Sequence, residues 1–220
     1  HINRRIQSAF PLLKFSAENL SSYSTIHGEN WRFTHKRYLF EVWIVQIAHI
    51  LILIMLKSEI EKILNEQVAI EFAAANAYLS MASWAESRNL ADIAAYLYPA
   101  SEDERMHGLE MSKYVNANGG VAEAPEVKAA RKEYANLLEL FEHVFELEHN
   151  NTLAINKIAD LCMKSMDYAT FKFMEKFVLE QQEAERSVSE LMHIIKTLGY
   201  DDRNLYFLNK TFKKINQGTF

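Results

Sequence analysis

The stretch Glu104-Arg105-Met106-His107 decides how this chain is interpreted. The carboxylate of Glu104 and the imidazole of His107 are three positions apart, so on a helix they point to the same side. That side also carries Leu97 and Met111, which predicts that both polar residues face a core. A buried carboxylate without a partner is costly, so a compensating group is needed. For this pair alone, the simplest interpretation is a core histidine satisfied by its own glutamate.

The composition predicts a helical protein of one domain, or one domain with an extension. The chain has 220 residues, 49% of them hydrophobic, with only 6 glycines and 3 prolines, which favours long helices with few turns. A net charge of −5 gives no reason to expect a nucleic acid partner. The single cysteine, Cys162, rules out an internal disulfide and fits a reducing, cytoplasmic location. Its place on an apolar stripe predicts core packing rather than nucleophilic chemistry.

Residues 1–54 differ from the rest of the chain. They contain no methionine and carry six Lys/Arg against three Asp/Glu, which leaves 18 against 26, a net −8, for residues 55–220. The apolar stretch Tyr38–Leu56 would suit a marginal membrane anchor or signal, although no small-residue cleavage site follows it. A native helical extension is a second interpretation. We favour a vector-derived or upstream-translated segment, with the biological start at Met55 and the folded domain at residues 55–220.

From Met55 onward, apolar residues recur with a helical period. Ser58 with Glu61, and Asn136 with Glu139, have the spacing of a capping box at the start of a helix. Asn89 and Asp167 are further candidate N-caps. These signals predict four long helices and a short fifth one, at roughly 59–86, 90–118, 136–166, 168–199 and 204–215.

The lengths of the connections predict the topology. The breaks near positions 88 and 166 are so short that the helices on either side must be antiparallel neighbours. The link at 119–135 could stretch to roughly 55 Å, whereas helices of this length are about 42 Å long. The second and third helices are therefore predicted to be parallel. The expected fold is all-α, a four-helix bundle with one long crossover followed by a short fifth helix.

Five polar residues on the inward stripes fall at one height in this bundle. Glu71 and Glu104 lie 17 and 16 residues from the break at position 88, while Glu148 and Gln181 lie 18 and 15 residues from the break at position 166. At about 1.5 Å per residue, these four and His107 fall within roughly one helical turn of each other. The sequence therefore predicts that they converge in the middle of the bundle.

Three carboxylates cannot share a dry core without a counter-charge. Two divalent or trivalent cations would supply it, and oxygen-rich ligands with one imidazole suit iron or manganese better than a structural zinc ion. The alternative is a buried, protonated polar network that binds no metal.

With these residues in place, the sequence from Met55 to Phe220 resembles bacterial non-haem ferritins. Together the shared motifs are far more specific than Glu-x-x-His alone. They are Leu64-Asn65-Glu66-Gln67, Ile70-Glu71, Glu104-x-x-His107, Asp167-Tyr168, Glu180-Gln181 and Leu205-Tyr206-Phe207.

The resemblance implies a ferroxidase centre with two irons per subunit and no haem. Glu71, Glu104 and His107 would hold one iron, and Glu104 would bridge to a second iron held by Glu148 with Gln181 beside it. Tyr78 matches the tyrosine near the diiron site of the family.

Asp103, Glu180 and Glu183 match an accessory third iron site in the same family. One position of that site, acidic in the family, is Ala184 here. The sequence therefore departs from the family pattern at this position, and we expect a weak or empty third site.

The resemblance also implies an activity and an assembly. Iron(II) would be oxidised by dioxygen or hydrogen peroxide, and iron(III) would be stored as a mineral inside a homo-oligomeric shell of twenty-four subunits, without a membrane partner. The acidic balance after Met55 fits a surface that attracts cations.

Other protein classes stay open from the residues alone. Bacterioferritins and rubrerythrin-like proteins repeat Glu-x-x-His on the fourth helix, where this chain has Glu180-Gln181-Gln182-Glu183. DNA-protecting miniferritins build their site between subunits, whereas these ligands fit inside one bundle. A diiron oxidase, peroxidase or oxygenase would need an organic-substrate pocket in the space that Tyr78 is expected to fill. A non-catalytic helical bundle would bind no iron.

Overall fold

The structure is a computed structural model that describes residues 42–43 and 56–219. The chain divides into two units, His1–Ile54 and Met55–Phe220, and the helices named below belong to the second unit. The hypotheses about the origin of residues 1–54 fall almost entirely outside the described residues and stay predictions. Among the described residues, we find no helix that could span a membrane.

Residues 56–219 form five helices and no strand, which confirms the predicted all-α class. The observed bounds agree with the predicted ones to within about three residues. The helices are α4 (Ser58–Ser87), α5 (Ala91–Ala117), α6 (Leu137–Lys164), α7 (Tyr168–Leu198) and α8 (Asp202–Asn216).

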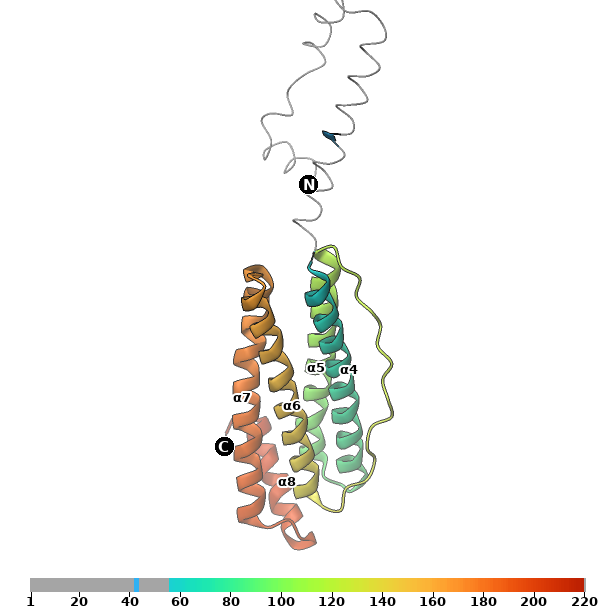
Figure 1. Cartoon of the computed structure of the whole chain (residues 1–220). Helices are drawn as coiled ribbons and strands as arrows, with labels where there is room; N and C mark the ends of the chain where they lie inside the picture. Colours follow the sequence, from blue (N-terminus) through green and yellow to red (C-terminus); the bar gives the residue numbers. More distant parts are fainter. Residues whose placement is uncertain (1–41, 44–55, 220) are drawn as a thin grey trace, which may run out of the picture. The chain divides into compact units, whose positions relative to one another are not determined.

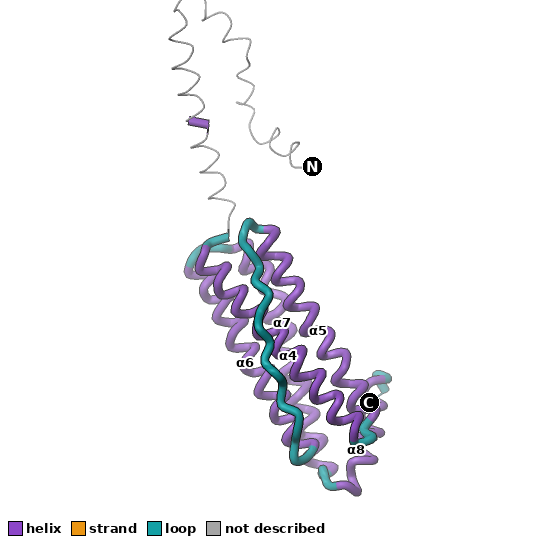
Figure 2. Tube along the Cα trace, turned by 90° about the vertical axis from the view of Figure 1, so that its right-hand side faces the viewer, coloured by secondary structure: helices purple, strands orange, loops and turns teal. Residues whose placement is uncertain are grey.

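The helices are connected as the loop lengths predict (Figure 1). Short turns make α4 and α5 antiparallel neighbours, and α6 and α7 likewise. The connection at 118–136 is extended and runs along the outside of the bundle from one end to the other (Figure 2), so α5 and α6 begin at the same end. The short α8 packs against α5 and α7. The fold is a four-helix bundle with one long crossover.

Two of the predicted N-caps are confirmed. The side chain of Asn136 accepts a hydrogen bond from the backbone N–H of Glu139 at 2.9 Å and so caps α6. The side chain of Asp167 accepts from the backbone N–H of Thr170 at 3.0 Å and caps α7. Each bond satisfies a backbone donor that the first turn of a helix leaves unpaired.

The capping box predicted for the first helix is wrong. Ser58 is already helical, and the N-cap residue is Lys57, which makes no side-chain capping bond. Glu61 instead accepts a hydrogen bond from the backbone N–H of Val121 at 2.8 Å. The carboxylate of Glu61 therefore binds the crossover instead of completing a capping box at the start of α4.

The prediction that Asn89 caps α5 is wrong. The N-cap residue is Leu90, which makes no side-chain capping bond. Asn89 has a φ of 61° and belongs to the turn that ends α4. Asparagine is among the residues that tolerate this left-handed conformation. The fifth helix begins slightly earlier than predicted because Asp201 accepts from the backbone N–H groups of Arg203 and Asn204.

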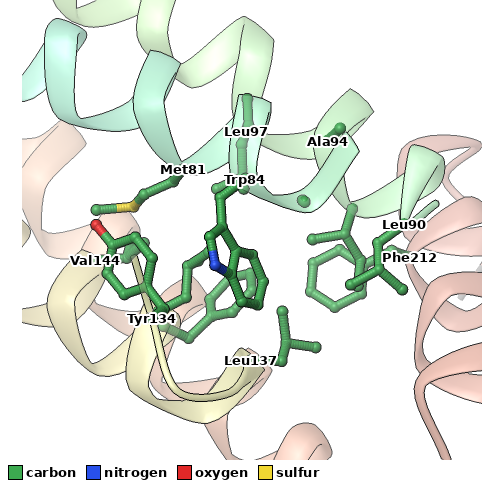
Figure 3. Close-up of a cluster of buried hydrophobic side chains, with 14 of the residues drawn as sticks. Met81, Trp84, Leu90, Ala94, Leu97, Tyr134, Leu137, Val144 and Phe212 are labelled. Atoms are coloured by element: carbon green, nitrogen blue, oxygen red, sulfur yellow. The ribbon is translucent and has the colours of Figure 1, made fainter. Parts of the chain in front are cut away.

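Two apolar clusters form the core, and a polar layer separates them. One cluster lies toward the α4–α5 turn and includes Trp84, Leu97 and Phe212 (Figure 3); the other includes Leu64 and Met111. Each of the four long helices contributes at least one buried polar side chain to the layer between the two clusters. These are Gln67 and Glu71 on α4, Glu104 on α5, Glu148 and Asn151 on α6, and Gln181 on α7.

Cys162 belongs to the second apolar cluster and is fully buried. Burial raises the pKa of its thiol to about 11, so the reactive thiolate is suppressed at neutral pH. The prediction that Cys162 serves in core packing is confirmed.

Candidate metal centre

The centre of the polar layer is a group of three side chains from α4 and α5. One ligand atom each from Glu71, Glu104 and His107 lies within 4.8 Å of the other two. His107 Nδ1 is 3.4 Å from Glu104 Oε2 and 3.9 Å from Glu71 Oε2. Within the described residues this is the one such group of histidine, cysteine or acidic side chains. A single cation could bind all three at once.

The other half of the layer is built on Glu148. Its Oε1 atom accepts a hydrogen bond from the hydroxyl of Tyr78, and its Oε2 atom accepts from Gln181 Nε2 at 3.0 Å. Gln181 Nε2 also reaches the backbone carbonyl of Glu148 at 3.1 Å. Tyr78 and Gln181 therefore hold this carboxylate in place from α4 and α7.

Burial raises the pKa of two of the carboxyl groups in this layer, which disfavours their charged form. Burial, reinforced by the neighbouring Glu104, raises the pKa of Glu71 well above its usual value. Burial also raises the pKa of Glu104 to about 7, and the charge of Glu148 adds to this effect. The pKa of Tyr78 is raised by burial and by Glu148, which keeps the phenol protonated. A bound cation would remove the penalty on the carboxylates, so these residues fit a metal-ion substrate.

The second ring nitrogen of His107 has its own partner. His107 Nε2 lies 3.6 Å from Glu180 Oε2 on α7, and the ring packs edge-on against Phe177, with the ring centroids 5.5 Å apart. Nδ1 faces Glu71 and Glu104, while Phe177 packs against the ring and Glu180 lies near the far nitrogen, beyond hydrogen-bond distance.

The candidate accessory residues are not gathered in the same way. Asp103, Glu180 and Glu183 are exposed, and they do not form a group of mutually close ligand atoms in the described chain. Both carboxylate oxygens of Glu183 are bonded to the guanidinium of Arg186, which also lowers the pKa of Glu183. Two of the three carboxylates therefore already have partners, Arg186 for Glu183 and His107 for Glu180.

Two residues of the layer are absent from the predicted site. Gln67 and Asn151 are both buried and lie against Glu71. The position of Gln67 four residues before Glu71, on the same face of the helix, is the signal that could have found it. For Asn151 the signal is weak, because the neighbouring polar residue Thr152 lies four residues after Glu148 and is the alternative on that face, although it is only half-buried.

Comparison with known proteins agrees with this geometry. The ferritin family, described as a ferritin-like domain, matches residues 61–198. A bacterial non-heme ferritin of Campylobacter jejuni is 34% identical over 161 residues, which cover 73% of this chain and 96% of that protein. A bacterial non-heme ferritin of Escherichia coli O6:H1 is 29% identical over 162 residues, covering 74% of this chain and 98% of that protein.

A similar fold is found among solved structures. The open pore ferritin of the hyperthermophilic archaeon Archaeoglobus fulgidus superposes with a TM-score of 0.69 at 32% identity, covering 71% of this chain and 96% of the other. These matches confirm the resemblance that the sequence motifs indicated. The chain belongs to the ferritin family.

Proposed function

We propose that this protein is an iron-storage ferritin that oxidises iron(II) at a diiron centre within each subunit and stores iron(III) as a mineral. The observation that carries this proposal is the group formed by the buried Glu71 and Glu104 with the partly buried His107, whose ligand atoms lie within 4.8 Å of one another. The group lies inside one bundle, as the resemblance to non-haem ferritins implies.

Six residues in and beside the layer have a role in this proposal. Glu71 and His107 bind the first iron, and Glu104 bridges it to the second. Glu148 binds the second iron, with Gln181 and Tyr78 holding its carboxylate through the hydrogen bonds described above. The raised pKa values of Glu71 and Glu104 support these roles, because a nearby cation would relieve the cost of their buried charge.

The redox chemistry belongs to the iron, while the protein supplies geometry and charge. Two iron(II) ions lose one electron each. Dioxygen takes up these two electrons and two protons to give hydrogen peroxide, or hydrogen peroxide takes them up to give two molecules of water. Three buried carboxylates stabilise iron(III) more than iron(II), because the higher charge interacts more strongly with them. The site therefore favours the oxidised product.

The proposal includes a hollow homo-oligomeric shell in the cytoplasm, with twenty-four subunits expected from the family. The surface of the bundle supports this part of the proposal, because large apolar side chains on several helices are exposed to solvent. Leu79, Leu179 and Phe207 are each at least 50% exposed, and such side chains are commonly covered when copies assemble.

Gel filtration of the purified protein, with iron quantified per subunit, tests the function. We expect a large assembly that takes up far more iron than two ions per subunit. Glu104→Ala should assemble normally but load iron slowly. Glu102→Ala is the matched control, because Glu102 lies on the same helix, is exposed and bonds only Arg105. A monomer or dimer holding two irons would instead favour an oxidase that acts on an organic substrate.

A further inference from the structure

Two buried amides contact the carboxylate of Glu71, and neither is a metal ligand in the scheme above. Gln67 Nε2 donates a hydrogen bond to Glu71 Oε1 at 2.7 Å, and the same nitrogen donates to Asn151 Oδ1. Asn151 Nδ2 lies 3.5 Å from Glu71 Oε2. The three side chains thus form one hydrogen-bonded unit that joins α4 to α6.

This unit determines which oxygen of Glu71 is available. Gln67 donates to Oε1, while Oε2, which Asn151 Nδ2 contacts at 3.5 Å, points toward His107, 3.9 Å from its Nδ1 atom. Each carboxylate oxygen has two lone-pair sites, so Oε2 can accept from Asn151 and still offer its other lone pair to a cation in a fixed direction. The amides are neutral donors, so they favour the charged carboxylate without adding negative charge to the pocket.

The cost of these amides argues for a role beyond packing. Gln67 is 1% exposed and Asn151 is 2% exposed, and Gln67 Oε1 is buried without a hydrogen-bond partner. Buried polar atoms in folded proteins are almost always paired, so an unpaired one calls for an explanation. Apolar side chains of the same size would fill this space without that cost. The hydrogen bonds that the amide groups donate to Glu71 account for their presence in this space.

We propose that Gln67 and Asn151 are positioning residues that act as a unit on Glu71, presenting its Oε2 atom to the metal ion shared with Glu104 and His107. The proposal rests on the function proposed above and extends it to two residues outside the ligand set. Hydrogen-bond partners of metal ligands typically contribute about 10- to 100-fold in metal affinity.

Cobalt(II) is a suitable probe, because it is not oxidised by air under mild conditions and its visible absorption reports the geometry of its ligands. The metal-free assembled protein is titrated with cobalt(II), comparing wild type with Gln67→Met, Asn151→Leu and the double variant. These substitutions keep the size of each side chain and remove its amide. Thr170→Val is the matched control, because it removes a buried hydroxyl eleven residues from Gln181 along α7.

We expect each single variant to bind the first cobalt(II) about 10- to 100-fold more weakly, with an altered visible spectrum. The double variant should bind cobalt(II) only slightly more weakly than the weaker-binding single variant, because the effects of substituting residues that act as a unit do not add. Thr170→Val should bind as wild type does. Circular dichroism confirms the helical fold of each variant, and Asn151→Ala replaces the leucine variant if that one misfolds.

Two different failures can be told apart. If wild type binds cobalt(II) and the folded Gln67 and Asn151 variants bind it with unchanged affinity and spectrum, the positioning role is wrong. Fully additive losses would show that the two amides act separately and would overturn the claim of a unit. If wild type itself binds no cobalt(II) in the polar layer, the proposed metal centre is wrong instead.

Discussion

Glu104→Gln offers a test of the electrostatic account of the polar layer. Glutamine keeps the size and shape of the side chain but cannot carry the charge that burial disfavours. In the metal-free protein this change should therefore stabilise the fold, although it removes a ligand. Removing a buried charge that lacks its partner is one of the few ways in which deleting a functional group adds stability.

The magnitude follows from the pKa of Glu104, which rises from 4.5 to about 7 on folding. Each pH unit of difference is worth about 1.4 kcal/mol, so the full effect is about 3 kcal/mol per subunit. Because the pKa of Glu104 is raised in the folded state, the wild-type protein has its full stability below pH 4.5, where this carboxyl group is protonated in both states. The wild-type protein loses this contribution as the pH rises to 7. The variant should therefore exceed wild type by about 1 kcal/mol at pH 5 and by about 3 kcal/mol at pH 8.

Thermal unfolding of the metal-free proteins at pH 5 and pH 8 measures this difference. For a domain of this size, about 3 kcal/mol corresponds to a rise in Tm of roughly 6–12 °C. Glu102→Gln is the matched control, since the exposed Glu102 pairs with Arg105 and should show no comparable gain. Added cobalt(II) should raise the Tm of wild type and leave that of Glu104→Gln nearly unchanged.

The reasoning would be refuted if the two metal-free proteins melted at the same temperature at pH 8. A difference that did not change between pH 5 and pH 8 would also contradict it, because the effect must follow the titration of Glu104.

Three further predictions concern other parts of the chain. His107→Ala should keep the fold but slow rapid iron(II) oxidation by more than about tenfold, measured by stopped-flow absorbance; an unchanged rate would remove His107 from the site. A chain that begins at Met55 should assemble and oxidise iron like the full chain, and failure to assemble on gel filtration would make residues 1–54 part of the fold. Ala184→Glu should strengthen iron binding near Asp103 and Glu180, as read by anomalous scattering from iron-soaked crystals; a fully occupied third iron in the unmodified protein would contradict this prediction.

The helices and their connections could be predicted because the signals are local or repeat many times. A helical period sustained over about thirty residues fixes the length of α4 and its buried face. The length of the crossover fixes the relative direction of α5 and α6. The heights of Glu71 and Glu104 on their helices then follow from simple counting.

The features that sequence reasoning missed depend on contacts between segments that are distant in the chain. The capping spacing of Ser58 and Glu61 was correct as a pattern, but the crossover binds Glu61 through Val121. Asn151 lies between Asn150 and Thr152, and only the rotation of α6 against α4 decides which of these polar residues is buried. The ion pair of Glu183 is different, because Arg186 lies three residues further on and could have been predicted from the spacing.

The central claim is that each subunit oxidises iron at a pair of ions, and counting the ions oxidised in the fast phase tests it most directly. The metal-free shell is mixed with increasing iron(II) in aerobic buffer, and the rapid absorbance change is followed by stopped flow. The two halves of the layer, one on Glu71, Glu104 and His107 and the other on Glu148, predict that the fast phase saturates at two iron(II) ions per subunit. Saturation at one ion per subunit, or the absence of a fast phase, would contradict the account.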